Sequence, residues 1–291
     1  MLKSARDFGT HYRAYAAQAG DSWRDMGLRL AKTRAETPRG YGVLEVGCGS
    51  PYPYVVLFHS AAVSVVGIDV LPLVRLDLRI AKYLDLRRAR GSVSALRRLA
   101  RDLLLHVMFD RPLLRSGEMS IRHSGVQLAR MEPTRCGLAD ASFNVGYSSA
   151  CFEYLPDVGG TVAGIDRLLK PNGIAEIEID VFAGMTGGHE RGLYSDTAPP
   201  TGFPLWAHFV DPEWKTPLFL NRWRDQQFRE RFAARFGILD RQVTSRLGEE
   251  YLTRDLENSL SPRYSSEEVT PESVLNVLQM IGSAAGELAR L

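Results

Sequence analysis

Short runs of apolar and β-branched residues alternate along the chain with segments whose apolar residues recur at helical spacing. Residues 42–47 and 63–69 are apolar runs that stop at a glycine or an acid, as buried parallel strands do. Pro51 and Pro53 introduce the apolar segment between them, and proline is tolerated in the first turn of a helix. Strand, glycine turn, helix and strand within about 30 residues predict a βαβ unit.

The same alternation continues through the middle of the chain. Residues 126–131, 143–150 and 174–181 are further apolar runs that predict strands. Residues 160–169 predict a helix, and the segment 170–173 (Lys-Pro-Asn-Gly) predicts its end. Because strands alternate with helices, we predict an α/β fold with a largely parallel sheet that helices cover on both faces.

The last third of the chain has a different pattern. Residues 183–212 hold several glycines and prolines and predict a long ordered loop, the kind of segment in which functional residues concentrate. A helix is predicted over 213–236 and a strand over 237–243. After Pro271 the apolar spacing predicts a short amphipathic helix that carries Val274, Leu275, Leu278 and Ile281.

Two segments lie outside the alternating pattern. Residues 1–39 are polar and weakly helical, and we predict an N-terminal helical cap. Residues 71–110 predict two amphipathic helices, and residues 75–102 contain nine basic and three acidic side chains, a difference of +6. Such helices are either solvated on their charged faces or form an anion-attracting wall over a site. The remaining divisions are a core at 40–182 and a substrate-side C-terminal part at 183–291.

Composition narrows the class of protein. Of the 291 residues, 45% are hydrophobic and 24% charged, as in globular domains, and the net charge of +2 excludes a polycation that coats nucleic acid. Cys48, Cys136 and Cys151 are scattered without zinc-finger spacing and favour a reducing compartment. The first residues do not have the pattern of a secretory signal, and no apolar run reaches the roughly 20 residues of a membrane span. We therefore expect a cytoplasmic protein that does not bind membranes; its oligomeric state cannot be inferred.

The candidate ligand site begins at the first glycine turn. Gly47 and Gly49 end the first predicted strand, where residues without a Cβ let the backbone approach a ligand. A dinucleotide fingerprint would need a third glycine where Tyr52 stands. Glu45 precedes the turn, and Asp69 ends the second strand, placed to accept hydrogen bonds from ribose hydroxyls. Two acids and no phosphate cradle favour a nucleoside with a positively charged tail and disfavour a nicotinamide oxidoreductase.

Five motifs follow one another along the chain: Glu45-Val-Gly-Cys-Gly-Ser, Val66-Gly-Ile-Asp, Asp140-Ala-Ser-Phe-Asn-Val, Phe152-Glu-Tyr-Leu-Pro-Asp and Leu168-Leu-Lys-Pro-Asn-Gly. In these motifs and their order, the chain resembles the class I S-adenosylmethionine-dependent methyltransferases. The resemblance covers residues 40–182 and implies a Rossmann-like, mostly parallel seven-stranded sheet with helices on both faces and a helical insertion after the second strand. It also implies S-adenosyl-L-methionine as the cofactor.

The resemblance implies roles for individual residues. The turn would lie under the methionine part of the cofactor and be supported by Glu45, Asp69 would hold the ribose, and Glu132 would lie near the adenine amine. Ser148 and Ser149 follow the fourth strand and would line the cofactor site. The full set of expected cofactor-binding residues is Glu45, Gly47, Cys48, Gly49, Asp69, Val70, Glu132, Ser148 and Ser149.

Three features depart from the family pattern. Asn144 stands where the family usually has aspartate, and Tyr154 stands where it usually has histidine. The insertion between Asp69 and Glu132 is also long. The first two departures concern the substrate side of the site more than the binding of the cofactor.

Candidate catalytic residues lie in the loop after the fifth strand. If the methyl acceptor is a hydroxyl, a base must remove its proton, and histidine is the usual choice near neutral pH. His189 follows two glycines in this loop, and His208 follows Trp206. Both could instead be structural. The acids nearby are dispersed along the chain, so we expect no metal site; they are Asp180, Glu190, Asp196 and Asp211.

The leading hypothesis is a methyltransferase that acts on a small molecule, more readily at oxygen than at nitrogen. Residues 148–153 lack the Asn/Asp-Pro-Pro-aromatic motif of base-modifying relatives, so we do not expect a nucleic-acid substrate. The basic helices expected at 75–101 nevertheless keep RNA or another polyanion open as an alternative. A second alternative is a catalytically silent subunit that binds the cofactor, because no base is certain.

Overall fold

The computed structural model divides into two compact units, residues 1–130 and 131–291, which are described separately. The structure describes residues 5–34, 41–49, 52–61, 63–71, 80–100, 102–103, 110, 120–189, 205–211, 213–216, 218–260 and 263–281.

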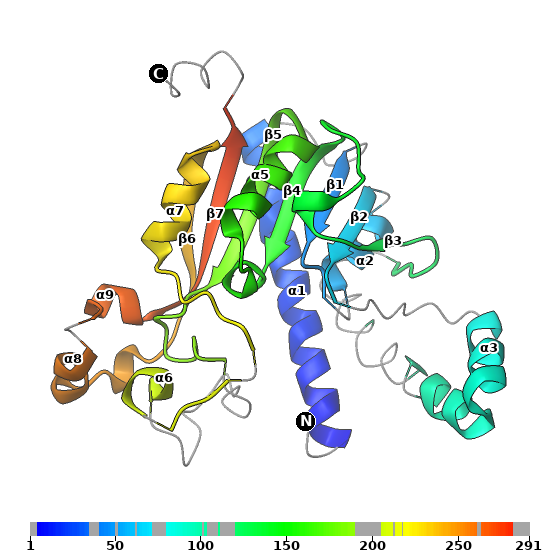
Figure 1. Cartoon of the computed structure of the whole chain (residues 1–291), viewed down its shortest axis with the longest axis horizontal. Coiled ribbons are helices and arrows are strands. Elements are labelled where there is room, and N and C mark those ends of the chain that lie inside the picture. Colours follow the sequence, from blue (N-terminus) through cyan, green and yellow to red (C-terminus); the bar gives the residue numbers. More distant parts are fainter. Residues whose placement is uncertain are drawn as a thin grey trace. The chain divides into compact units, whose positions relative to one another are not determined.

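Unit 1 contains the predicted βαβ arrangement and a third parallel strand (Figure 1). Its strands follow the order β3-β2-β1, with Leu44 opposite Val66 and Asp69 opposite Arg130. The first two predicted strands, the helix between them and the strand near residue 127 are confirmed. The elements of this unit are α1 (Ala5–Arg34), β1 (Gly42–Val46), α2 (Pro53–Ser60), β2 (Ser64–Asp69), α3 (Ile80–Arg90) and β3 (Gln127–Arg130).

The apolar composition of α2 explains its position in unit 1. Every residue from Pro53 to Phe58 is buried, as expected for a helix that is apolar on all sides. The helix packs closely on β2 because Gly67 has no side chain, since a Cβ there would lie 2.5 Å from Cγ2 of Val55. The rings of Trp23 in α1 and Phe58 in α2 meet edge to face, with centroids 4.8 Å apart.

The insertion is helical where it is described. α3 is followed by a second helical stretch over residues 92–100, and the Tyr83 hydroxyl donates a hydrogen bond to Asp102, whose side chain is fully buried. Apolar side chains of this second helical stretch are exposed: Val93 and Leu96 are 64% and 67% exposed. Predicted helical residues 72–79 and 104–109 lie outside the described residues.

The strands of unit 2 follow the order β4-β5-β7-β6; β4 pairs with β5 in parallel, and β7 pairs antiparallel with β5 and with β6. In Figure 1, α7 (yellow) runs beside β6. Its elements are η1 (Pro133–Arg135), β4 (Phe143–Ser149), η2 (Phe152–Tyr154), α5 (Val158–Leu168), β5 (Leu169–Asp180), α6 (Ala207–Val210), α7 (Asp225–Ala233), β6 (Phe236–Arg246), η3 (Glu249–Tyr251), α8 (Arg254–Leu260), α9 (Ser266–Val269) and β7 (Pro271–Met280).

The strand order confirms the predicted fold class. Among the described residues the seven strands follow the order β3-β2-β1-β4-β5-β7-β6, and β7 is antiparallel to both β5 and β6. With helices between the strands, this is an α/β, Rossmann-like sheet that is mostly parallel.

The prediction of a helix after Pro271 is wrong, because this segment is the strand β7. Val274, Leu275, Val277 and Leu278 are all buried. β7 pairs with β5 on one side and with β6 on the other. An interior strand buries residues on both faces, so its apolar residues do not alternate and their spacing imitates a helix.

The predicted helix over 213–236 is wrong in its first half. α7 begins only at Asp225, after Arg224, whose backbone N–H donates to the Gln227 side chain at the N-terminus of the helix. Arg222 has a positive φ of 58°, a conformation that does not continue a helix. The sequence also has a proline at position 217, inside the predicted helix.

Residues 170–173, predicted to end a helix, lie in the irregular start of β5, where the pairing with β4 shifts register and Asn172 has a φ of 61°. Residues 190–204 of the predicted loop lie outside the described residues. Within the part of the chain that the structure describes, each helix is too short or too polar to cross a lipid bilayer.

Candidate functional site

In unit 1, the glycine turn is fastened to the end of β2. Gly47 and Gly49 have positive φ angles of 73° and 63°, which glycine adopts without strain. The amides of Gly47 and Cys48 donate to the carbonyl of Ile68, at 2.9 and 3.2 Å. The amide of Gly49 donates to Oδ2 of Asp69, at 2.9 Å. The turn therefore depends on both the backbone and the carboxylate at the end of β2.

Asp69 also fixes the chain that follows β2. Its Oδ1 accepts a hydrogen bond from the amide of Leu71 at 2.7 Å, and its side chain is largely buried. Each carboxylate oxygen can accept more than one hydrogen bond, so these two contacts leave acceptor capacity on Asp69. A ribose hydroxyl is a donor that this capacity suits.

Glu45 is the second acid of this site. It is only 3% exposed, and its Oε2 has no hydrogen-bond partner among the described residues. Burial raises the pKa of its carboxyl well above the usual value; the amide of Val55 acts in the opposite direction, and the charge of Asp69 raises the pKa further. A buried acid with an unused oxygen beside another acid suits a positively charged ligand. S-adenosylmethionine carries positive charge on its sulfonium and amino groups, so these residues fit the cofactor.

The other expected cofactor residues of unit 1 stay predictions. Cys48 is buried against β2, because a Cβ added to Gly67 would lie 3.1 Å from its Sγ. Val70 is 48% exposed, and its carbonyl accepts a hydrogen bond from Nε of Arg130 at 2.8 Å.

The expected cofactor residues of unit 2 also stay predictions. Glu132 precedes η1 and accepts a hydrogen bond from the Thr134 hydroxyl at 3.3 Å. Ser148 is fully buried in β4. The Ser149 hydroxyl donates to Oε2 of Glu178 on β5, at 2.9 Å, and so links the carboxyl ends of these two parallel strands.

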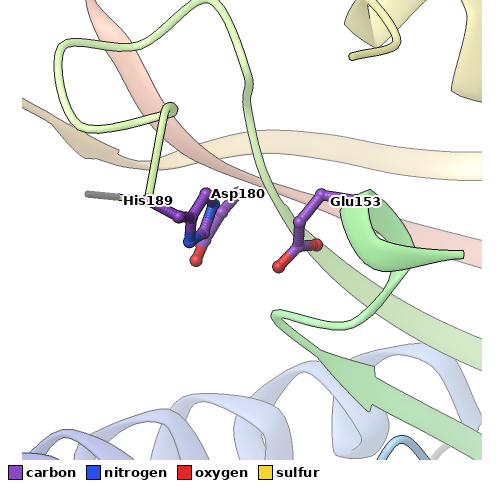
Figure 2. A group of neighbouring side chains, drawn as sticks. All are labelled: Glu153, Asp180 and His189. Atoms are coloured by element: carbon purple, nitrogen blue, oxygen red, sulfur yellow. The ribbon is translucent and has the colours of Figure 1, made fainter. Parts of the chain in front are cut away.

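Three side chains of unit 2 meet close to that edge of the sheet. Glu153 lies on η2 after β4, Asp180 ends β5, and His189 ends the turn that follows β5. One ligand atom from each residue lies within 4.8 Å of the others. Figure 2 shows the Glu153 carboxylate directed toward Asp180 and His189. Parallel strands place their carboxyl ends at one edge of a sheet, and this is where open α/β sheets bind ligands.

Glu153 is the most deeply buried member of this cluster. It is 3% exposed, and neither carboxylate oxygen has a hydrogen-bond partner of good geometry among the described residues. Burial raises its pKa well above the usual value, and the charges of Asp180 and Glu178 raise it further. The amides of Glu153 and Asp180 lower its pKa without compensating for burial. A carboxyl in this position is stabilised by a proton or by a cation.

Asp180 is held by the neighbouring strand. The Ser273 hydroxyl of β7 donates to its Oδ1 at 2.8 Å. Burial raises the pKa of Asp180 to about 6, an effect that the Ser273 hydrogen bond reduces and the charge of Glu178 increases.

His189 is positioned by its backbone and by Tyr154. It has a positive φ of 50°, and its amide donates to the carbonyl of Thr186 at 2.9 Å. The Tyr154 hydroxyl and Nδ1 of His189 share a hydrogen bond of 2.6 Å. Burial lowers the pKa of His189 to about 4, so the imidazole is neutral at pH 7. The tyrosine that departs from the family pattern thus contacts a predicted catalytic residue.

His208, the second candidate base, supports the loop. Its Nε2 donates to the carbonyl of Phe182 at 2.8 Å, and a Cβ added to Gly188 would lie 2.8 Å from its own Cβ. Burial lowers its pKa to about 4. Its ring packs on Phe182 and Phe209, with centroid distances of 5.0 and 4.1 Å. These contacts favour a structural role for His208, and its catalytic role stays a prediction.

Glu153 and Tyr154 were not among the expected site residues, and Asp180 was considered only as one of several dispersed acids. A signal was present, since Glu153 follows the fourth strand and Asp180 ends the fifth. The partner of Tyr154 could not be inferred, because it depends on how the turn after β5 returns.

Parts of this sequence are similar to known proteins. Residues 86–177 match a family described as a methyltransferase domain. An uncharacterized methyltransferase of Mycobacterium bovis (strain BCG) is 28% identical over 188 residues, which cover 65% of this chain and 57% of the relative. A counterpart in Mycobacterium tuberculosis (strain H37Rv) is 27% identical over 188 residues, with the same coverage of 65% and 57%. The chain therefore spans little more than half the length of the curated relatives that it matches.

Solved structures also match this chain, at low sequence identity. An S-adenosylmethionine-dependent methyltransferase from Mesorhizobium loti covers 86% of this chain and 96% of its own, with 12% identity and a TM-score of 0.45. The domain match over residues 86–177 and the curated relatives support the resemblance of the chain to the class I S-adenosylmethionine-dependent methyltransferases.

Proposed function

We propose that this protein uses S-adenosyl-L-methionine to methylate a small molecule at a hydroxyl oxygen. The cofactor supplies a methyl group on a positively charged sulfur. Transfer to oxygen then requires that the acceptor be aligned with this group and that its proton be removed. The chain supplies both requirements within its own residues.

The observation that carries the proposal is the cluster of Glu153, Asp180 and His189 with its hydrogen bond to Tyr154. Three groups that can accept a proton converge at the carboxyl ends of β4 and β5. His189 is neutral and can take a proton, and the nearby carboxylates would stabilise the imidazolium that forms. An acceptor hydroxyl bound against this cluster would lose its proton to it as the new bond forms.

Aromatic and cationic side chains next to the cluster favour a small, partly apolar or anionic acceptor. The guanidinium of Arg222 lies 5.7 Å from the ring centre of Phe182 and 5.6 Å from that of Trp214. Together with His208 and Phe209, these groups could contact an aromatic or acidic portion of a metabolite.

RNA or another polyanion is the second candidate substrate, and one observation favours it. Arg87, Arg88 and Arg90 of α3 are exposed, and an open hollow beside them is lined by Leu86, Arg90, Ser94, Arg97 and Arg98. Exposed arginines on adjacent helices attract phosphates. We favour a small acceptor because of the proton-accepting cluster. A surface that binds a polyanion by charge alone does not need such a cluster.

The proposed location is the cytoplasm. Cys48, Cys136 and Cys151 are all thiols. Unoxidised cysteines fit a reducing compartment.

The test is methyl transfer from labelled S-adenosylmethionine to metabolite extract and, separately, to total RNA. We expect a labelled small product with the wild-type protein. His189→Asn should reduce its formation by on the order of 100-fold while cofactor affinity, measured by calorimetry, changes little. Label in RNA, with binding that falls steeply as salt rises, would instead support the second candidate. Cofactor binding with no product in either sample would indicate a silent subunit.

A further inference from the structure

We propose that Glu153, Asp180 and His189 form a binding site for a first-row divalent metal ion such as Zn²⁺ or Mn²⁺. From the sequence we expected no metal site, because the acids of this region are dispersed along the chain. The inference concerns cation binding and goes beyond the proposed methyl transfer.

The donor set suits such an ion. One imidazole and two carboxylates provide nitrogen and oxygen ligands, and their ligand atoms lie within 4.8 Å of one another. Zn²⁺ binds histidine nitrogen and carboxylate oxygen at about 2.0–2.2 Å, so small side-chain adjustments would close the three ligands on one ion. Three protein ligands would leave a further coordination position for water or substrate. The nitrogen ligand favours Zn²⁺ or Mn²⁺ over Mg²⁺, which prefers an all-oxygen octahedron.

Glu153 provides an independent observation. Its carboxylate is 3% exposed, is directed toward the other two side chains in Figure 2, and has no hydrogen-bond partner of good geometry among the described residues. A buried ionised carboxylate without a partner is costly. A divalent cation would remove that cost and the repulsion between Glu153 and Asp180.

The surrounding groups fix two of the three ligands as in known metal sites. Nδ1 of His189 contacts the Tyr154 hydroxyl at 2.6 Å, so we assign Nε2 as the ligand nitrogen. The Ser273 hydroxyl holds Oδ1 of Asp180 at 2.8 Å, which assigns Oδ2 as its ligand atom. Metal-bound histidines usually hydrogen-bond through the other ring nitrogen, and ligating carboxylates are hydrogen-bonded in turn.

A bound ion would change the part that His189 plays. A divalent cation lowers the pKa of a hydroxyl or water that coordinates it. His189 would then hold the ion instead of taking the proton itself. This consequence rests on the proposed function, whereas the binding of the cation does not.

The test uses the full-length protein after treatment with a chelator, without cofactor or acceptor. Titration calorimetry with ZnCl₂ should show one site, with much weaker binding of MgCl₂. Glu153→Gln and His189→Asn should each weaken zinc binding by roughly 10- to 100-fold or more, because even the loss of a residue that only hydrogen-bonds to a metal ligand has an effect of this size. Glu272→Gln is the matched control, because this buried acid of unit 2 contacts Thr186 and lies outside the cluster. It should bind zinc like the wild type.

A second measurement needs no variant to fold. Co²⁺ added to the wild-type protein should give visible ligand-field absorption and a paramagnetically shifted imidazole N–H signal that ZnCl₂ abolishes. Absence of zinc and cobalt binding, or binding unaltered in both cluster variants, would overturn the inference. Zinc binding without any methylated product would support the site and refute the proposed reaction. Product formed by chelator-treated protein that binds no zinc would do the reverse.

Discussion

The carboxylate of Asp69 that is predicted to bind the cofactor also accepts hydrogen bonds from two backbone amides. Asp69→Asn keeps one acceptor oxygen but turns an amide NH₂ toward one of the two backbone N–H groups that Asp69 holds. We expect cofactor affinity to fall by roughly 1.5–3 kcal/mol, the range for hydrogen bonds to a charged group. Calorimetry with S-adenosylmethionine measures this loss.

A control separates binding from folding in this experiment. Asp85→Asn changes an exposed acid on α3, paired with Arg88, and should leave affinity unaltered. The thermal midpoint of each variant shows whether the turn survives. Wild-type affinity in a folded Asp69→Asn protein would remove Asp69 from the cofactor site.

In the proposed reaction Tyr154 would be a positioning residue that acts through His189, to which it is hydrogen-bonded. Tyr154→Phe removes the hydroxyl of the 2.6 Å hydrogen bond but keeps the ring, which meets the imidazole edge to face at 5.1 Å. We expect kcat to fall by on the order of 10- to 100-fold with little change in KM, because orientation of a catalytic group affects the transition state more than substrate binding. Tyr264→Phe, elsewhere in unit 2, is the comparison variant. An equal effect of both variants, or a change in KM alone, would argue against this role.

At the scale of elements, the contact between β2 and α2 depends on Gly67. In Gly67→Ala the new Cβ would lie 2.5 Å from Val55 and 3.0 Å from Leu128, so the helix or the strand must shift. Such overpacking costs about 1–3 kcal/mol of unfolding free energy. Urea denaturation gives the value directly.

Gly27 provides the matched control in the same unit. A Cβ added there meets nothing within 4 Å, and the residue lies inside α1. Gly27→Ala should stabilise the protein by about 0.5–1 kcal/mol, because alanine loses less backbone freedom in a helix. The two substitutions therefore have opposite expected signs. Destabilisation by both substitutions would mean that a side chain at position 27 also meets neighbouring atoms, contrary to the open space around Gly27.

Elements were predictable from the sequence where a local pattern decides them. β1, α2 and β2 follow from apolar runs with a glycine turn and an N-terminal proline. The segment from Pro271 to Met280 was not predictable, since its burial on both faces comes from pairing with β5 and β6, two strands distant in sequence. Pairing with other strands, and not the local spacing of apolar residues, therefore makes this segment a strand.

At the scale of the whole molecule, the order of motifs predicted the sheet but not the cluster in unit 2. The acids of the first glycine turn could be anticipated, because Glu45 and Asp69 sit at the ends of consecutive strands of one βαβ unit. Glu153, Asp180 and His189 come from three separate segments, and the meeting of the last two depends on a turn fixed by Thr186. No short motif encodes such a convergence.

The dependence of overall stability on pH reflects the buried acids. Burial raises the pKa of Glu272 from 4.5 to about 7. The hydrogen bonds from Thr186 and from the amide of Met185 lower this pKa, whereas the charge of Asp180 raises it further. A raised folded-state pKa gives stability that is fully present below pH 4.5 and is lost as the pH rises through about 7. The rise corresponds to roughly 3 kcal/mol of unfolding free energy.

Glu272→Gln should remove this dependence, since an amide can keep the contacts with the Thr186 amide and hydroxyl without ionising. We expect the variant to match the wild type near pH 4.5 and to exceed its unfolding free energy by up to roughly 3 kcal/mol at pH 8. Urea unfolding of both proteins across this pH range measures the difference in unfolding free energy. Glu45 and Glu153, whose pKa values are also raised, are present in both proteins, so their contributions cancel in this difference. The exposed Glu267→Gln should show a constant difference. A constant difference for Glu272→Gln as well would mean that Glu272 ionises alike in the folded and unfolded chains.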